Sequence, residues 1–184
     1  NKPMVYYSLS VLMLADIKEY LIITSPEHVS NFKTLLNDGN QLGINIQYAE
    51  QQKANGIAEA FKIGREFIGN DPVTMILGDN ILFGAGLRGK LQEIKFDNKA
   101  AIFSYEVKDP ERYGVIELDS NNIPKTIEEK PKAPRSRLAI PGIYMYPNDV
   151  ITKVESLKPS ARGELEITDL NKLYLEEKRL QVIP

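Results

Sequence analysis

Gly78, Asp79 and Asn80 interrupt an apolar stretch, VTMILGDNILFG, that runs from Val73 to Gly84. If the apolar residues before them form a buried strand, the carboxylate of Asp79 lies where that strand ends. In open α/β sheets, ligands bind outside the carboxyl ends of the strands. A carboxylate there suits Mg²⁺, which also keeps waters and substrate phosphates as ligands, and Asn80 could donate to a sugar or phosphate oxygen. Taken alone, the three residues favour a plain turn or a cap on the next helix.

A second candidate is the stretch TIEEKPKAP, from Thr126 to Pro134. Neighbouring residues of a strand face opposite sides, so Glu128 and Glu129 cannot form one paired-carboxylate site. If Glu129 enters a cleft, it can accept hydrogen bonds from sugar hydroxyls, and Lys130 can supply a point charge for a phosphate. A solvated run of charges explains the stretch equally well.

A third candidate begins at Gln51, in the stretch QQKANGIAEAF. A glutamine amide both donates and accepts hydrogen bonds, as reading the edge of a nucleobase requires. The helix expected after Gly56 would direct its free N–H groups back toward the strand ends. The chain contains no G-x-x-x-x-G-K-[ST] motif, so this is not a P-loop. Taken alone, the signal is weak.

Two further stretches place glycines beside aromatic residues. They are YGVIELD, which begins with Tyr113 and Gly114, and RLAIPGIYMY, which includes Ile140 and Tyr144. Glycine lets a ligand approach the backbone of a strand closely, which suits contact with a sugar ring. The same pattern is more often plain β-sheet packing, so neither stretch identifies a sugar site by itself.

Strand-like and helix-like patterns alternate through residues 1–99 and predict a nucleotide-binding part. We expect a doubly wound, Rossmann-like α/β fold with a mostly parallel sheet and helices on both faces. Strand-like runs joined by turns in residues 100–146 predict a β-rich, antiparallel extension over the rim where the parallel strands end. Helical patterns return in residues 147–184, and the final RLQVIP indicates the beginning of a strand. Together these parts form one expected domain.

The composition excludes several classes of function. Zero cysteines and a single histidine exclude disulfides, thiolate catalysis and a histidine-rich zinc site, and the lack of cysteine fits a reducing cytoplasm. A formal charge of -2, without a block of like charges, argues against nucleic-acid binding. No apolar run approaches the roughly 18 residues of a membrane span. We therefore expect a cytoplasmic protein that binds neither nucleic acid nor membrane.

A series of motifs covers nearly the whole chain. In order, they are Q-Q-x-x-x-G-I-A, L-G-D-N, D-P-E-R-Y-G-V-I-E, E-E-K-P-K, G-I-Y-M-Y and A-R-G-E-L-E-I-T-D-L-N. The series resembles the sugar-nucleotide pyrophosphorylases, a family of sugar nucleotidyltransferases, and most closely the members that use dTTP and glucose-1-phosphate. The resemblance implies an α/β nucleotide-binding core with a β-rich sugar-binding insertion, a Mg²⁺ cofactor and a homotetramer. It also implies a place in dTDP-rhamnose and cell-surface polysaccharide synthesis.

The resemblance implies a role for each candidate residue. Asp79 matches the Mg²⁺ ligand and, with Lys130, the catalytic positions. The positions for the nucleotide are Gln51 and Gly56, which match residues that recognise thymine, together with Asp79 and Asn80. The positions for the sugar and its phosphate are Tyr113, Gly114, Glu129, Lys130, Ile140 and Tyr144. The implied step is in-line attack of a glucose-1-phosphate oxygen on the α-phosphorus of dTTP, which depends on charge neutralisation and alignment.

The chain also departs from the family pattern. Family members begin with a strand and a loop, G-x-G-x-R-L, that cradles the triphosphate, and a downstream aspartate shares the metal with the position of Asp79. Neither is present, and Pro141 stands where the family usually has threonine. We therefore expect a fragment of a longer enzyme that is inactive alone. Two alternatives stay open: a nucleotidyltransferase that uses UTP or CTP, and a truncated, non-catalytic module that binds a nucleotide-sugar.

Overall fold

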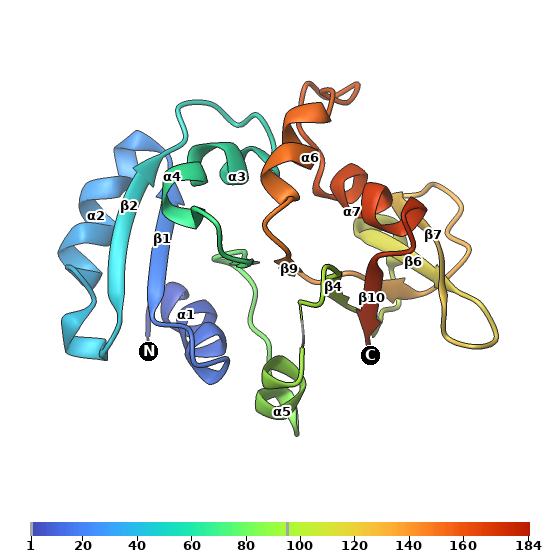
Figure 1. Ribbon diagram of the computed structural model, residues 1–184, viewed down its shortest axis with the longest axis horizontal. Helices are drawn as coiled ribbons and strands as arrows, with labels where there is room; N and C mark the ends of the chain where they lie inside the picture. The colour runs from blue at the N-terminus through green and yellow to red at the C-terminus, as the bar shows by residue number, and fades with distance from the viewer. Residues whose placement is uncertain (1, 95) are drawn as a thin grey trace.

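The computed structural model describes residues 2–94 and 96–184. Helices and strands alternate in the first half of the chain and give way to a series of strands in the second (Figure 1). In chain order, the elements are α1 (Val5–Leu14), β1 (Glu19–Thr24), α2 (Pro26–Leu36), η1 (Asn40–Leu42), β2 (Asn45–Glu50), α3 (Glu59–Ile63), α4 (Arg65–Ile68), β3 (Val73–Ile76), α5 (Leu87–Gln92), β4 (Ala100–Phe103), β5 (Tyr105–Glu106), η2 (Pro110–Arg112), β6 (Gly114–Leu118), β7 (Pro124–Glu129), β8 (Leu138–Ala139), β9 (Ile143–Tyr146), α6 (Val150–Ser156), α7 (Ile167–Glu176) and β10 (Leu180–Ile183). The predicted α/β class is confirmed.

β1 and β2 form a parallel pair at one side of the molecule, with α2 as the crossover between them (Figure 1). Ser25 stands at the N-cap position of α2 and Pro26 in its first turn, and both residue types favour a helix start. Because the strands are parallel, their carboxyl ends lie at the same edge. Gln51 follows β2 at this edge, where its backbone N–H donates to the carbonyl of Thr24 at 2.9 Å.

A four-stranded sheet in the order β10-β4-β9-β3 forms the centre of the molecule (Figure 1). β9 is antiparallel to both β3 and β4, and β10 is parallel to β4, so β3, β4 and β10 run in one direction. These three strands share one direction, as expected for a mostly parallel sheet, while β9 lies antiparallel between β4 and β3. β10 is the strand expected at the end of the chain. The register pairs Ile76 with Ile143, which brings the residues before β9 against the turn that follows β3.

The structure places β4 and β9 in the central sheet, although the sequence patterns put residues 100–146 together in the extension. Every residue of these two strands is buried, as is typical of strands covered on both faces. The extension proper is a second sheet in the order β5-β8-β6-β7, which is antiparallel throughout as predicted. Its β6–β7 pair places Gly114 opposite Glu129, and α7 packs against β7.

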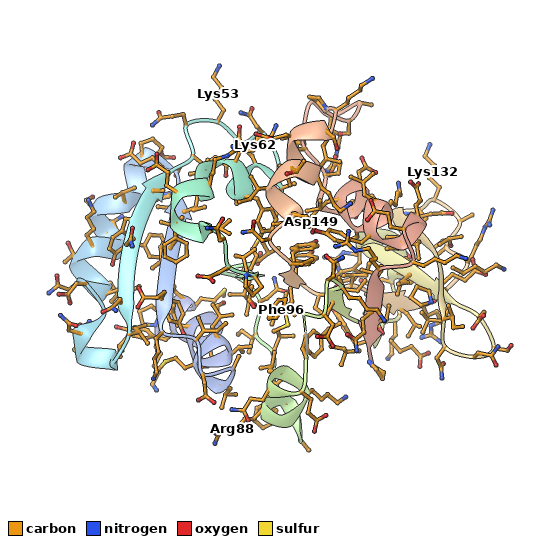
Figure 2. All side chains as sticks on the ribbon, viewed as in Figure 1. Lys53, Lys62, Arg88, Phe96, Lys132 and Asp149 are labelled. Atoms are coloured by element: carbon orange, nitrogen blue, oxygen red, sulfur yellow. The ribbon has the colours of Figure 1, made fainter. Side chains whose placement is uncertain are left out.

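An aromatic cluster connects the central sheet to α6 and α7. Tyr146 stacks on Tyr174 with ring centroids 5.4 Å apart, and its hydroxyl donates to Asn171 Oδ1 at 2.6 Å. The hydroxyl of Tyr174 donates to Asp149 Oδ1 at 2.8 Å, and Arg179 Nη1 donates to Asp149 Oδ2 at 2.7 Å. Asp149 therefore holds a tyrosine and an arginine from neighbouring elements near the middle of the molecule (Figure 2).

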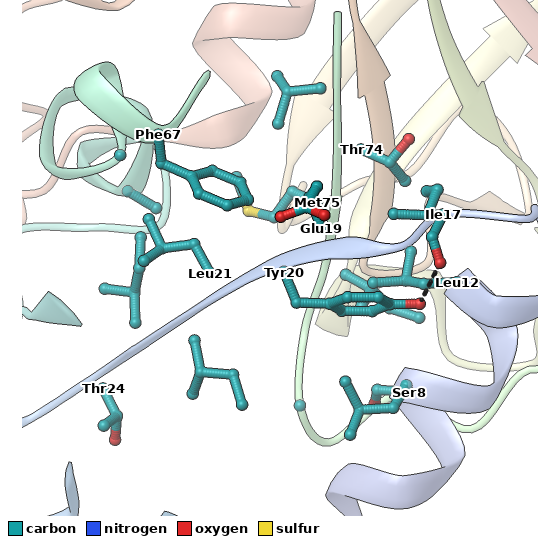
Figure 3. A pocket seen from close by; sticks show the side chains of 18 of the residues that line it. Ser8, Leu12, Ile17, Glu19, Tyr20, Leu21, Thr24, Phe67, Thr74 and Met75 are labelled. Carbon is teal, nitrogen blue, oxygen red and sulfur yellow. Dashed lines mark hydrogen bonds between the residues drawn. The ribbon is translucent and has the colours of Figure 1, made fainter. Parts of the chain in front are cut away.

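An apolar pocket of about 380 Å³ lies between β1 and β3 (Figure 3). Leu21 of β1, Met75 of β3 and Phe67 of α4 contribute to its wall. In the part of the chain that the structure describes, β1 pairs only with β2, and β3 only with β9, so each strand has one open edge. Tyr20 donates to the carbonyl of Ile17 at 3.0 Å, and burial raises the pKa of Tyr20 to about 12.

The residues from Gly84 to Gly89 match G-x-G-x-x-G, the pattern of a dinucleotide-binding turn. That motif requires a strand leading directly into the first glycine and a helix opening after it. Here β3 ends at Ile76, well before Gly84, and α5 has only six residues. The match therefore has the wrong structural context. Among the described residues, no helix is both long and apolar enough to cross a membrane.

Candidate functional site

Asp79 lies in a turn directly after β3. The N–H of Leu77 donates to the carbonyl of Gly142 at 2.8 Å, and the N–H of Asn80 returns to the carbonyl of Leu77 at 3.1 Å. The turn exposes the side chain of Asp79. The next helix begins only at Leu87, so Asp79 is not its cap. The carboxylate is thus available to a ligand at the end of the strand.

Asn80 connects this turn to the segment before β9. Its Nδ2 donates to Asp79 Oδ1 at 2.8 Å, and its Oδ1 accepts the N–H of Gly142 at 2.9 Å. A Cβ on Gly142 would lie 2.6 Å from the side chain of Leu77 and 2.8 Å from Asn80 Nδ2, so any larger residue would displace these side chains. The Ser8 hydroxyl on α1 faces the carbonyls of Leu77 and Asn80 at 3.1 and 3.2 Å. The amide of Asn80 therefore orients Asp79 and retains one N–H for a ligand.

The structure brings three of the predicted sugar-site residues together. A Cβ on Gly114 would lie 3.3 Å from Glu129 Oε2 and 3.9 Å from the side chain of Ile140. The N–H of Ile140 donates to the carbonyl of Gly114 at 2.8 Å. Thr168, which sequence reasoning missed, joins them: its hydroxyl donates to Glu129 Oε2 at 2.5 Å. The only sequence signal for Thr168 was its place in A-R-G-E-L-E-I-T-D, beside acidic residues at a helix start.

Lys130 follows Glu129 in a left-handed conformation, with φ of 42°. Its N–H donates to the carbonyl of Tyr113 at 3.0 Å, so the hairpin holds the backbone while the exposed side chain can extend toward a phosphate. The positive charge of Lys130 also acts on the carboxylate of Glu166. Burial opposes ionisation of Glu166, but hydrogen bonds from Arg162 and Ser160, aided by Lys130, hold its pKa below the usual range.

Tyr144 of β9 lies between the two groups of residues. Its side chain is 5% exposed. Burial raises its pKa well above the usual value, and the negative charges of Glu129 and Asp79 raise it further. The segment from Ile140 to Gly142, which precedes β9, also connects the two groups: its Ile140 N–H donates to the carbonyl of Gly114 beside Glu129, and its Gly142 N–H donates to Asn80 beside Asp79.

The loop after β2 forms the other part of the site. Gln51 Nε2 donates to the carbonyl of Gly56 at 3.2 Å and to Glu59 Oε2 at 2.7 Å. Gly56 has φ of +100°, and a Cβ there would lie 2.4 Å from the carbonyl oxygen of Leu165. The N–H of Leu165 donates to the carbonyl of Asn55 at 2.6 Å. The loop is thereby attached to the segment that leads into α7 and Thr168.

The candidate metal centre rests on a single carboxylate. Within residues 2–94 and 96–184, no three His, Cys, Asp or Glu side chains come together as a metal site. An exposed carboxylate held from one side by an amide fits Mg²⁺ that is bound mostly through phosphates and water. It does not fit Zn²⁺ or Ca²⁺, which take more ligands from the protein.

Comparisons with known proteins define the class. Residues 1–183 match the family model described as nucleotidyl transferase, so the chain belongs to that family. The chain is 51% identical over 183 residues to glucose-1-phosphate thymidylyltransferase of Neisseria meningitidis, a match that covers 99% of this chain and 64% of the relative. It is 47% identical to the protein of that name from Mycobacterium tuberculosis, over 99% of this chain and 63% of the relative. The chain therefore spans less than two thirds of these relatives.

Solved structures agree with this placement. The fold matches a putative glucose-1-phosphate thymidylyltransferase from Bacillus anthracis, in complex with sucrose, with a TM-score of 0.90 and 39% identity over 98% of this chain and 73% of that one. A UDP-glucose pyrophosphorylase complexed with UDP-glucose matches with a TM-score of 0.81 and 23% identity, over 100% of this chain and 79% of that one. At that identity the second match shows the shared fold alone.

Proposed function

We propose that this chain carries the substrate-binding part of a glucose-1-phosphate thymidylyltransferase, which forms dTDP-glucose and pyrophosphate from dTTP and glucose-1-phosphate. The observation that carries the proposal is the segment Ile140–Gly142. At one end it hydrogen-bonds to Gly114 beside Glu129, and at the other it hydrogen-bonds to Asn80 beside Asp79. This arrangement supports one cleft with a sugar on one side and a nucleotide phosphate on the other. The names of the relatives support the same substrates.

In the proposed reaction, a phosphate oxygen of glucose-1-phosphate attacks the α-phosphorus of dTTP. The new P–O bond forms as the bond to pyrophosphate breaks, and no protein nucleophile is needed. Lys130 would bind the sugar phosphate, while Glu129, with Tyr113, Gly114, Ile140 and Tyr144, would hold the glucose. Asp79 would hold Mg²⁺, which when bound supplies positive charge to the phosphates. The protein's own contribution is alignment and fixed charge.

Wider roles follow from the same proposal. dTDP-glucose would supply dTDP-rhamnose and cell-surface polysaccharides, the reaction would take place in the cytoplasm, and the enzyme would be a homotetramer. Size-exclusion chromatography with light scattering on the full-length protein tests the last of these. A monomer or dimer at micromolar concentration would contradict it.

Product formation from glucose-1-phosphate with dTTP, UTP, CTP and ATP, each at the same concentration with Mg²⁺, tests the proposed substrates. We expect dTTP to give the highest kcat/KM in the full-length protein that carries this chain. A preference for UTP would replace the thymidylyl assignment with the closest alternative. Binding of dTDP-glucose without turnover of any nucleotide would favour a non-catalytic module instead.

A further inference from the structure

Glu59, which no prediction used, holds two side-chain amides of the loop after β2. Its Oε2 accepts from Gln51 Nε2 at 2.7 Å, and its Oε1 accepts from Asn55 Nδ2 at 2.8 Å. Glu59 is the first residue of α3 and is partly buried. A carboxylate accepts hydrogen bonds but cannot donate them, so it imposes one orientation on any amide that it contacts.

The orientation of the Gln51 amide is fixed by its surroundings. The Nε2 atom lies 2.7 Å from Glu59 Oε2 and 3.2 Å from the carbonyl oxygen of Gly56. Both partners are acceptors, so only the NH₂ end of the amide can face them, and its two hydrogens are used. The amide is planar, so Oε1 is directed away from both partners. A glutamine without such partners can turn its amide over and present either end.

The loop consequently presents a fixed acceptor and a free donor. Within the part of the chain that the structure describes, neither Gln51 Oε1 nor the N–H of Gly56 has a hydrogen-bond partner. The backbone on either side of Gly56 is held by Leu165, whose N–H donates to the carbonyl of Asn55 at 2.6 Å and whose carbonyl accepts the N–H of Ala58 at 3.3 Å. A Cβ at Gly56 would lie 2.4 Å from that carbonyl oxygen, so the close approach requires glycine. An acceptor and a donor on one short loop can read two adjacent atoms of a base.

We infer that Glu59 determines which nucleobases this loop accepts. Thymine and uracil present a ring N–H beside a carbonyl oxygen, which complements Gln51 Oε1 and the Gly56 N–H. Guanine also presents a ring N–H beside a carbonyl oxygen, but it is larger. Cytosine and adenine present a ring acceptor beside an NH₂ donor, so both hydrogen bonds to the loop would be mismatched. Glu59 is therefore a positioning residue that acts through Gln51. The inference rests on the proposed function, since it takes the loop to be the base-binding part of that site.

The inference narrows one of the alternatives that the sequence left open, a nucleotidyltransferase that uses UTP or CTP. It excludes CTP as the preferred nucleotide but does not separate dTTP from UTP, which share this edge. A binding site that hydrogen-bonds its substrate strongly rejects an analogue that leaves the polar groups of the site unpaired. An apolar pocket rejects an analogue of slightly different size much more weakly. Discrimination between dTTP and CTP should accordingly exceed that between dTTP and UTP.

The test measures kcat/KM for dTTP, UTP and CTP in the full-length protein and in three variants. Glu59→Leu removes the acceptor and lets the Gln51 amide turn over, so we expect the dTTP-to-CTP ratio to fall about tenfold. Glu59→Gln keeps an oxygen that can accept from Gln51 Nε2, so its dTTP-to-CTP ratio should stay close to that of the wild type. Glu66→Leu, which removes an exposed glutamate on the neighbouring helix α4, should leave it unchanged. The dTTP-to-UTP ratio should stay the same throughout.

A dTTP-to-CTP ratio that stays within about twofold of the wild type in a folded Glu59→Leu protein would overturn the inference. If Glu59→Leu fails to fold, Gln51→Leu provides the second test, because removal of the side chain that Glu59 orients should lower the dTTP-to-CTP ratio about tenfold and leave only the contact of the Gly56 N–H. A ratio within about twofold of the wild type in Gln51→Leu would also overturn the inference. Absence of turnover with every nucleotide in the wild type would instead contradict the proposed function, and the inference with it.

Discussion

The two sides of the molecule differ in how completely their elements are partnered. Around Gly114 and Glu129, β6 has a strand on each side, α7 covers β7, and Ile116 is fully buried. Among the residues that the structure describes, β1 and β3 each have one open edge, and their side chains line an apolar pocket (Figure 3). The side around Gly114 and Glu129, where we propose that the sugar binds and which we call the sugar side, is therefore held by contacts on both edges of β6. The side around β1, which we call the β1 side, makes fewer contacts among the described residues, and we expect its local stability in this 184-residue chain to be lower.

Truncation of one apolar side chain on each side tests this difference: Ile116 is fully buried, and Leu21 is partly buried. Ile116→Ala should lower the free energy of unfolding by about 2–5 kcal/mol, because it leaves a cavity in a packed core. Leu21→Ala, at the wall of the existing pocket, should cost only about 1 kcal/mol, because it enlarges space that is already open. Urea denaturation of the 184-residue chain measures both. Equal losses would show that the β1 side is packed as tightly as the sugar side.

The Thr168–Glu129 hydrogen bond offers a sharper test of the sugar side. Thr168→Val removes the donor that orients Glu129, so KM for glucose-1-phosphate should rise about tenfold while KM for dTTP changes little. Thr126→Val is the matched control, because Thr126 of β7, the strand that ends at Glu129, makes a similar bond to Glu117 of the neighbouring strand β6. Steady-state kinetics on the full-length protein checks both variants. An equal rise for the two substrates would indicate a general structural effect instead.

The smallest expected effect is a pH dependence from Glu166. Its pKa is lowered in the folded protein, so its contribution to stability is complete above the unfolded pKa of about 4.3 and is lost as the pH falls through the folded value. Glu166→Gln should therefore flatten part of the decline in stability below about pH 5. Urea midpoints measured between neutral and acid pH check this. An unchanged acid profile in the variant would show that Glu166 is not coupled to folding.

Features of the site that depend on local sequence were predictable. The alternation of side chains along a strand predicted that Glu128 and Glu129 lie on opposite faces of β7. The end of an apolar run predicted that Asp79 lies in a turn after β3. The antiparallel extension and the strand at the end of the chain followed from patterns of a few residues each. Such features need no knowledge of which distant segments pair.

Features that depend on distant contacts could not be predicted in the same way. Thr168 reaches Glu129 across 39 positions of sequence, and Gly142 reaches Asn80 across 62. The inclusion of β4 and β9 in the central sheet also depends on pairings between separate parts of the chain. The roles of Thr168, and of Asn80 as the link between Asp79 and the segment before β9, emerge only when these segments are packed.

We propose that Asp79 supports transfer of a nucleotidyl group to glucose-1-phosphate at a site shared with Glu129. The most direct measurement is the rate of dTDP-glucose formation with Mg²⁺ by full-length Asp79→Asn, beside Asp97→Asn as a control at an exposed aspartate outside the site. We predict that Asp79→Asn lowers kcat at least about 100-fold and that Asp97→Asn has no effect. A rate for Asp79→Asn within about threefold of the wild type, less than about 1 kcal/mol of barrier, would contradict the claim.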